Sequence, residues 1–135
     1  MASFSLNVIT PEKVFFEGET TQIIVRTTEG DIGILANHTS LVADLPSGPL
    51  KIRQEDGSWK VAAVSTGLLK VGGNKVSILA NAVEWADEID LEWAKRSEED
   101  ARQRLNQKSS QHELDLAELK LQRALNRISV GSKKF

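Results

Sequence analysis

The sequence predicts an α+β protein in two parts: an N-terminal antiparallel β-sandwich over residues 1–86 and a C-terminal antiparallel two-helix hairpin over residues 87–135. The first observation is that residues 1–84 contain all three Pro, eight of the nine Gly and most of the Val, Ile and Thr. β-Branched residues favour pleated strands, and Gly and Pro favour turns. The second observation is that the remaining residues are rich in charges and helix formers, with apolar residues three and four apart.

Strand signals recur along the first part at a spacing of roughly eight to twelve residues, which is typical of a sandwich or barrel. The clearest runs are residues 4–8, 22–27, 32–35, 50–54, 59–64, 68–71 and 75–79. Asp56-Gly57 and Gly72-Gly73-Asn74 separate pairs of runs, and both predict hairpins with primed turns. We expect about eight to ten short strands in two packed sheets, because two sheets are needed to bury both apolar faces.

The second part predicts two amphipathic helices. Asp90 is a suitable N-cap for a helix over residues 90–105, and Ser110 with Glu113 forms a capping box for a second helix that Gly131 ends. The polar segment 106–109 separates them. The facing residues are expected to be Leu91, Ala94, Ala101 and Leu105, interrupted by Glu98, and Leu114, Ala117, Leu121, Ala124 and Ile128. Because alanines bury little area, we expect a marginally held hairpin that can open.

Composition and charge exclude several classes of function. A formal net charge of −2 lacks the excess of Lys and Arg that a non-specific nucleic-acid binder needs. No apolar stretch approaches the roughly 20 residues of a membrane helix, and the absence of cysteine excludes disulfides and Cys-ligated zinc. His38 and His112 have no second ligand at a metal-binding spacing, so no metal is expected. The first residues lack a basic, apolar signal, which predicts neither secretion nor organelle import.

No catalytic constellation is apparent in the sequence. Residues 67–73 have the outline of a phosphate loop, but Gly73 and Asn74 stand where Lys and Ser or Thr are required. The neighbouring carboxylates are interpreted as an acidic helix start rather than an acid-base pair: Glu84, Asp87, Glu88 and Asp90. We therefore expect no catalytic residue. An unrelated β-sandwich hydrolase is the enzymatic alternative, which a turnover screen would test.

Several segments carry a resemblance to a known family. They are residues 28–35 with His38, residues 66–71 leading into 75–80, Ile89-Asp90, and residues 121–127. In order, spacing and length, the chain resembles the epsilon subunits of bacterial F-type ATP synthases over nearly its whole length. The resemblance implies a non-catalytic rotor subunit whose sandwich binds the gamma subunit and the ring of c subunits. It also implies a hairpin that permits turnover when folded and, when extended onto the alpha and beta subunits, inhibits ATP hydrolysis. By the same resemblance the subunit lies peripherally on the cytoplasmic face of the bacterial inner membrane, and contacts the membrane only through the complex.

The resemblance assigns contacts to the sandwich. Glu29 and Asp31 correspond to a turn that faces the polar loops of the c-ring, and the alternative is a solvated hairpin tip. His38 corresponds to the family's histidine near the gamma contact, and the alternative is a structural histidine. Ala36-Asn37 stands where relatives commonly have Pro-Gly, which predicts a different geometry for this loop.

Lys120, Arg123 and Arg127 lie on one face of the second predicted helix, and we call them the basic stripe. By resemblance, the basic stripe meets an acidic loop of the beta subunit when the hairpin is extended. The alternative is an ordinary solvated face, paired within the helix with Glu113, Asp115 and Glu118.

The resemblance also implies a candidate ATP site, because some relatives bind ATP in the folded hairpin through an Ile-Asp-x-x-Arg-Ala motif and arginines of the second helix. The matching residues are Glu84, Ile89, Asp90, Ala94, Arg123 and Arg127. Trp93 replaces the motif arginine and Glu92 adds an anion, which weakens the expected affinity for a polyphosphate. Trp93 instead stacks on adenine or on Arg127, or packs the hairpin against the sandwich. No cofactor is required; ATP is the candidate regulatory ligand, and ATP sensing is the alternative function.

Overall fold

The computed structural model describes residues 2–107 and 110–133. The chain divides into two compact units, Met1–Trp85 and Ala86–Phe135. The first unit contains eight strands: β1 (Phe4–Ile9), β2 (Val14–Thr20), β3 (Gln22–Thr27), β4 (Gly30–Leu35), β5 (Leu41–Leu45), β6 (Gly48–Arg53), β7 (Trp59–Gly72) and β8 (Lys75–Trp85). The second contains a short 3₁₀ turn, η1 (Ala86–Glu88), and the helices α1 (Leu91–Leu105) and α2 (Gln111–Gly131). Lys108 and Ser109 of the predicted polar break lie outside the described residues.

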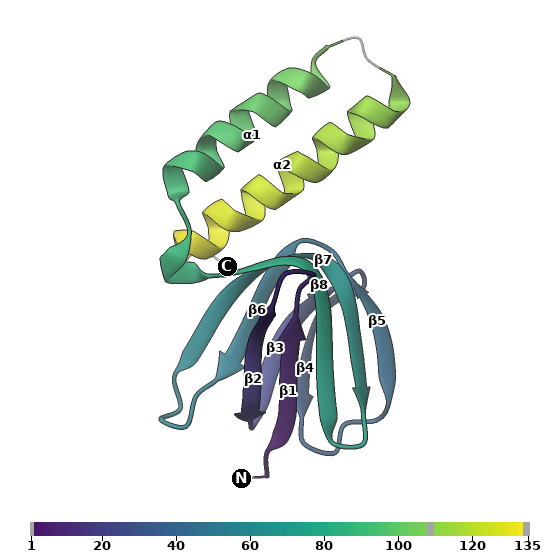
Figure 1. Ribbon diagram of the computed structural model, residues 1–135, viewed down its shortest axis with the longest axis vertical. Coiled ribbons are helices and arrows are strands. Elements are labelled where there is room, and N and C mark those ends of the chain that lie inside the picture. The colour runs from purple at the N-terminus through teal and green to yellow at the C-terminus, as the bar shows by residue number, and fades with distance from the viewer. Residues whose placement is uncertain (1, 108–109, 134–135) are drawn as a thin grey trace. The chain divides into compact units, whose positions relative to one another are not determined.

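Hydrogen bonds join all eight strands in one sheet, which folds over on itself around a single core (Figure 1). The strand order is β2-β1-β8-β7-β6-β3-β4, and β5 pairs with β7. The predicted β-sandwich is confirmed, although one strand pair, β1 with β8, is parallel. The buried core is aliphatic apart from Phe4 and receives side chains from seven strands: Phe4, Leu6, Val8, Ile23, Val25, Ile34, Leu45, Leu50, Ile52, Ala62, Val64, Leu69, Val71, Val76, Ile78, Ala80 and Val83.

The sequence predicts two strands where the structure has the single 14-residue strand β7. Its first half pairs with β6 and its second half with β5. The change of partner falls at Thr66, which has a φ of 32°, and Gly67. A Cβ on Gly67 would lie 2.2 Å from the carbonyl oxygen of Leu79. This close approach of two backbones requires glycine, so Gly67 marks a bend within a strand rather than the end of one.

The two predicted primed turns have different outcomes. Gly73 and Asn74 have φ angles of 59° and 57° between the paired ends of β7 and β8, which confirms a two-residue primed turn. At Asp56-Gly57 the predicted hairpin is confirmed, but the primed turn is wrong because only Gly57 has a positive φ, of 88°. The Gly57 N–H donates to the Gln54 carbonyl at 3.0 Å, so the connection is an ordinary turn followed by a left-handed glycine. The longer connection lets Asp56 keep the negative φ that L-residues favour.

Both helix starts are confirmed by their caps. The Asp90 carboxylate accepts a hydrogen bond from the Trp93 N–H at 3.0 Å, and the Ser110 hydroxyl accepts one from the Glu113 N–H at 3.2 Å. The buried residues of the helices are mostly alanines, as predicted: Ala94, Ala101, Ala117, Leu121, Ala124 and Val130. Val130 was not foreseen, and the larger predicted facing residues are only half-buried: Leu91, Leu105, Leu114 and Ile128.

Gly131 is the last residue of α2, but it does not adopt the left-handed conformation expected of a terminating glycine. That conformation belongs to Lys133, with a φ of 59°. A Cβ on Gly131 would lie 2.8 Å from Leu91 Cδ2 and 3.2 Å from Ile89 Cγ2. Glycine therefore allows the end of α2 to approach the segment that leads into α1.

Candidate functional site

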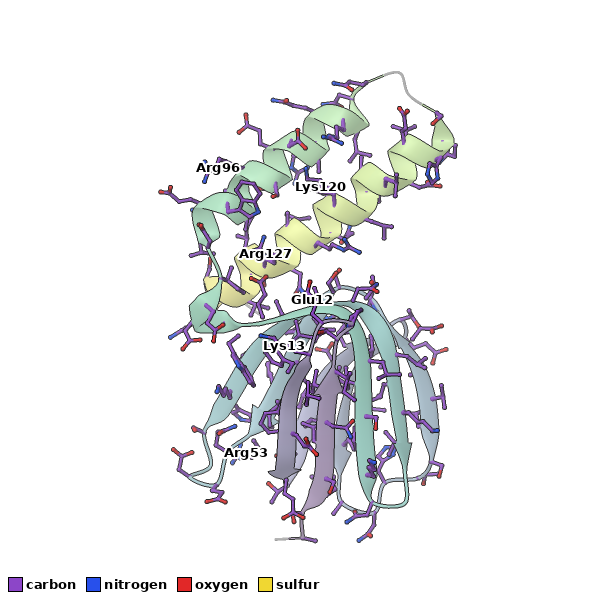
Figure 2. All side chains as sticks on the ribbon, viewed as in Figure 1. Glu12, Lys13, Arg53, Arg96, Lys120 and Arg127 are labelled. Carbon is purple, nitrogen blue, oxygen red and sulfur yellow. The ribbon has the colours of Figure 1, made fainter. Side chains whose placement is uncertain are left out.

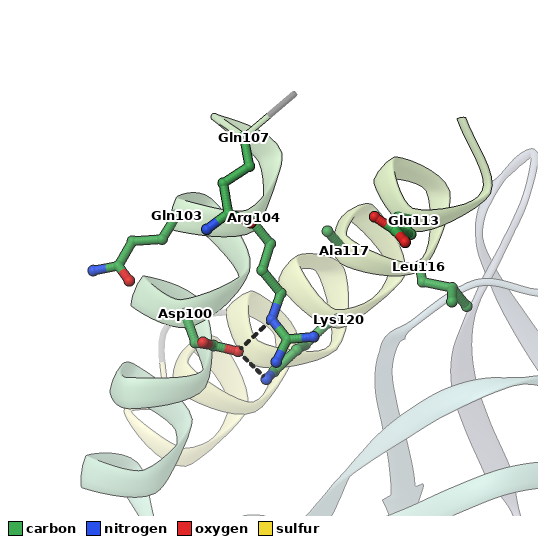
Figure 3. A pocket seen from close by; sticks show the side chains of 8 residues that line it. All are labelled: Asp100, Gln103, Arg104, Gln107, Glu113, Leu116, Ala117 and Lys120. Atoms are coloured by element: carbon green, nitrogen blue, oxygen red, sulfur yellow. Dashed lines mark hydrogen bonds and ion pairs between the residues drawn. The ribbon is translucent and has the colours of Figure 1, made fainter. Parts of the chain in front are cut away.

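A cluster of charges connects the two helices of the hairpin (Figure 3). Arg104 follows Asp100 by one turn of α1, and its Nε lies 3.0 Å from Oδ2 of Asp100. Lys120, on α2, donates from its Nζ to the same carboxylate oxygen. The hydrogen bond from Lys120, with a smaller effect of the Arg104 charge, holds the pKa of Asp100 below its ordinary value although partial desolvation opposes the shift. Asp100 thus joins α1 to α2 in its ionised form.

A groove of about 630 Å³ opens beside this cluster. Its lining residues come from both helices: Asp100, Gln103, Arg104, Gln107, Glu113, Leu116, Ala117 and Lys120. Two acids and two bases balance one another, so the groove has no net charge to favour an ionic ligand. Within residues 2–107 and 110–133, no group of three or more His, Cys, Asp or Glu side chains is placed to hold a metal ion.

The basic stripe is only partly available in the folded hairpin. Lys120 is held by Asp100, so these two residues lie level with each other in the antiparallel helices. Because the helices are antiparallel, a residue later in α2 lies level with a residue earlier in α1. Counted from the contact of Lys120 with Asp100, Arg123 lies level with Ser97 and Arg127 level with Trp93. The guanidinium of Arg123 is exposed and has no hydrogen-bond or ion-pair partner among the described residues. Arg127 is half-buried on the same helix (Figure 2).

Asp115 and Glu118, two acids of α2, form hydrogen bonds with glutamines of the same helix. Asp115 accepts a hydrogen bond from Gln111 Nε2 at 2.9 Å. Glu118 accepts one from Gln122 Nε2, also at 2.9 Å. Lys120 is therefore paired with an acid of the other helix, Asp100.

Three residues of the candidate ATP motif have structural roles in the hairpin. Ile89 packs against Gly131, Asp90 caps α1, and Ala94 is completely buried between the helices. Arg123 and Arg127 belong to the same unit. Glu84 is a half-buried residue of β8 and belongs to the sandwich unit.

Trp93 is largely open to solvent, with 55% of its surface exposed. The guanidinium carbon of Arg96 lies 5.5 Å from the centroid of its ring. Arg96 is therefore a cation beside Trp93, and the stacking of Trp93 on Arg127 stays a prediction. One turn of helix separates Arg96 from Trp93, which explains the pairing because residues three apart share a helix face.

The candidate contacts of the sandwich lie at opposite ends of β4. At the β3–β4 turn, Asp31 is paired with Arg26 on the facing strand, with 2.9 Å between Oδ1 and Nε. The Glu29 carboxylate is exposed and has no partner among the described residues, so it is the freer acid of this turn. His38 follows the other end of β4, half-buried, with Nδ1 2.7 Å from the Thr39 carbonyl oxygen.

The loop that contains His38 is held by Asn74. Asn37 has a φ of 64°, and its N–H donates to Asn74 Oδ1 at 3.0 Å. Asn74 Nδ2 in turn donates to the Ser3 carbonyl at 3.0 Å. Asparagine tolerates the left-handed region better than other residues with a Cβ. Asn37 therefore supplies a conformation that glycine would also adopt, so the replacement of glycine does not by itself change the loop.

The structure also shows an apolar row that the sequence analysis missed. Register pairs Val14 with Ile9, Ile9 with Leu79, and Leu79 with Leu68, so four aliphatic residues cross β2, β1, β8 and β7 in line. Val14 and Leu79 are 55% and 48% exposed. A shallow groove of about 350 Å³ includes Ile9 and Leu79 in its lining. Exposed apolar surfaces of this kind mark interaction sites. Strand alternation places these residues opposite the core, but only the register aligns them.

No helix within the described parts of the chain is long and apolar enough to cross a membrane.

The β-sandwich and the two antiparallel helices each match a domain of one class of ATP synthase subunit. Residues 3–86 match the family described as ATP synthase, Delta/Epsilon chain, beta-sandwich domain, and residues 87–131 match ATP synthase, Delta/Epsilon chain, long alpha-helix domain. The chain therefore belongs to the ATP synthase delta/epsilon family, among the epsilon subunits of bacterial F-type ATP synthases. It is accordingly a component of an ATP synthase complex.

Individual relatives agree over nearly the whole chain. The ATP synthase epsilon chain of Ruminococcus albus is 49% identical over 135 residues, covering 99% of this chain and 100% of the relative. That of Caldicellulosiruptor bescii is 44% identical over 131 residues, covering 97% and 95%. Among solved structures, a chain of the Euglena gracilis mitochondrial ATP synthase, in an assembly of OSCP, F1 and the c-ring, superposes with a TM-score of 0.82 at 25% identity, covering 93% of this chain and 79% of the other.

Proposed function

We propose that this epsilon subunit is a non-catalytic rotor element that couples the catalytic head to the c-ring, and that its hairpin inhibits ATP hydrolysis when it opens. The observation that carries the proposal is the hairpin seam, in which four of the six buried residues are alanines. Such a seam buries little apolar area, so the closed and open states differ little in free energy. The sandwich, by contrast, has a continuous core of larger aliphatic side chains and supplies a rigid contact for transmitting torque.

The proposal assigns partners to separate surfaces. The apolar row of Val14, Ile9, Leu79 and Leu68 supports binding of the gamma subunit, because exposed aliphatic side chains gain most from burial in an interface. Glu29 supports a contact with the polar loops of the c-ring, since its carboxylate has no partner among the described residues. The subunit then lies peripherally at the cytoplasmic face of the bacterial inner membrane, as part of the complex.

The basic stripe supports the inhibitory contact. Arg123 is exposed and lies one turn from Arg127, so an open α2 presents a row of cations to the acidic loop of the beta subunit, with the alpha subunit alongside. Single exposed ion pairs contribute little, but several formed together are enough to bias an equilibrium with a small free-energy difference.

The test is ATP hydrolysis by the matching catalytic core that lacks its epsilon subunit. The core receives either the full chain or a version ending at Glu88, with co-purification to measure binding and circular dichroism to confirm that the shortened chain is folded. Binding of both, with inhibition by the full chain alone, is the expected result. Equal hydrolysis rates with both would show that the hairpin is no brake, and failure of both to bind would contradict the rotor assignment.

The alternative function is ATP sensing by the closed hairpin. It is supported by the unpaired Arg123 and by the exposed ring of Trp93, which offers a face for adenine. It is weakened by Asp90, whose carboxylate already caps α1. A ligand specific for the closed state must raise its stability. No rise in melting temperature at millimolar ATP would exclude this function, and an Arg123→Gln variant would identify the arginine if a rise occurs.

A further inference from the structure

We propose that Asp100 is a latch that keeps the hairpin closed by occupying Lys120, a cation that the open hairpin would otherwise present to its partner. The proposal rests on the proposed inhibitory role of the hairpin and adds the residue that restrains it. The ion pair between the Asp100 carboxylate and the Lys120 ammonium joins α1 to α2 across 20 positions of sequence.

Lys120 has no acidic neighbour on its own helix. The positions three and four residues away, where helical ion pairs form, carry apolar residues or another cation: Leu116, Ala117, Arg123 and Ala124. The nearest acids of α2, Asp115 and Glu118, accept hydrogen bonds from glutamines instead. In the closed hairpin the charge of Lys120 is therefore balanced from α1, by Asp100.

Opening the hairpin has an asymmetric effect on this cluster. Arg104 lies on α1 with Asp100 and stays beside it when the helices separate, with its Nε 3.0 Å from the carboxylate. The contact with Lys120 breaks, because it is the one that crosses to α2. Asp100 thus keeps Arg104 as its partner in both states, while Lys120 is released only in the open state.

The two uses of Lys120 exclude each other. An ammonium held against Asp100 on α1 cannot at the same time bind an acidic surface reached by a separated α2. Asp100 therefore competes with the partner for the basic stripe. It also offsets the repulsion between Lys120 and Arg123, which lie three residues apart on α2.

The α1 helix provides a matched control for this latch. Glu98 and Arg102 form an ion pair, with 3.5 Å between Oε2 and Nε, that lies entirely within α1 and does not cross to α2. Asp100→Asn removes the carboxylate charge of the latch at nearly constant size. Glu98→Gln removes a carboxylate charge from the same helix and breaks an ion pair that lies within α1.

The experiment measures the distance between α1 and α2 in the full chain by pulsed electron spin resonance. Spin labels are placed on Glu99→Cys and Gln122→Cys, two exposed positions in a chain with no native cysteine. Asp100→Asn is expected to raise the open-to-closed ratio roughly two- to fivefold at low salt, the range for an exposed ion pair. Glu98→Gln is expected to leave it nearly unchanged. An unchanged ratio in Asp100→Asn, or an equal rise in both variants, would overturn the latch.

A second variant separates loss of the latch from a general loss of helix stability. Lys120→Met is expected to open the hairpin as Asp100→Asn does, and the double variant to open it no further, because both changes remove the same contact. Additive effects would contradict the proposal. In the reconstituted complex, opening by Asp100→Asn should accompany stronger inhibition of hydrolysis. If the hairpin opens while the rate of hydrolysis is unchanged, the result supports the latch and contradicts the proposed inhibitory role of the hairpin.

Discussion

The two helices pack closely at Ala101. A larger side chain at this position is therefore expected to favour the open hairpin. Ala101 is completely buried, and leucine adds three carbon atoms at a site where a methyl group already fills the space. Forcing extra carbons into a filled site costs about 1–3 kcal/mol. Ala101→Leu should therefore raise the open-to-closed ratio roughly five- to 150-fold, at about 1.4 kcal/mol for each factor of ten.

The assay is hydrogen exchange of backbone amides in the full chain, followed by mass spectrometry of peptides from each unit. Peptides of α1 and α2 should lose protection in Ala101→Leu, while those of the sandwich core stay unchanged as an internal reference, because that core contains no hairpin residue. Gln103→Leu adds a leucine at an exposed position of the same helix and should have little effect. Unchanged protection in Ala101→Leu, or an equal loss in Gln103→Leu, would refute the reasoning.

Three further predictions concern the sandwich and the charge cluster. Gly67→Ala should destabilise the sandwich by at least about 2 kcal/mol, since its Cβ would lie 2.2 Å from a carbonyl oxygen. The control Gly33→Ala, whose Cβ would have no atom closer than 3.7 Å, should have a melting temperature close to that of the unaltered chain. Leu79→Lys in the apolar row should weaken binding to gamma about tenfold or more, whereas Leu35→Lys, also half exposed, should not; equal binding constants for the two would remove the row from the interface. Because the pKa of Asp100 is lower in the closed hairpin than its ordinary value of about 3.9, its stabilisation is present above that value and is lost as the pH falls through the lowered pKa. Distances between the spin labels should lengthen only in acid, below about pH 4, and lengthening toward alkaline pH would contradict this.

Local patterns predicted the fold well where one residue or one short run decides the structure. The caps at Asp90 and Ser110, the turn at Gly73-Asn74 and the alanine seam all depend on neighbours within a few residues. The bend at Gly67 was missed because it depends on contact with Leu79 across the sheet. Strands β2, at Val14–Thr20, and β5, at Leu41–Leu45, were missed because their pairing with β1 and β7 is a tertiary choice that their own residues do not reveal.

The candidate site was harder to predict for the same reason. The basic stripe is visible from helical spacing, but its pairing is not, since Asp100 and Lys120 meet only through the register of two helices. The sequence does contain one indication of this pairing: no acid lies three or four residues from Lys120 on its own helix. Likewise, the four residues of the apolar row come into line only when the register of four strands is known.

The central claim is that the open hairpin inhibits hydrolysis and the closed one does not. Its most direct test uses the full chain carrying Glu99→Cys and Gln122→Cys, closed by a short bifunctional maleimide that joins the two cysteines and bound to the catalytic core. The account predicts that the cross-linked subunit binds without inhibiting ATP hydrolysis, while the same chain without cross-linker inhibits. Equal inhibition by the cross-linked and free forms would contradict the account.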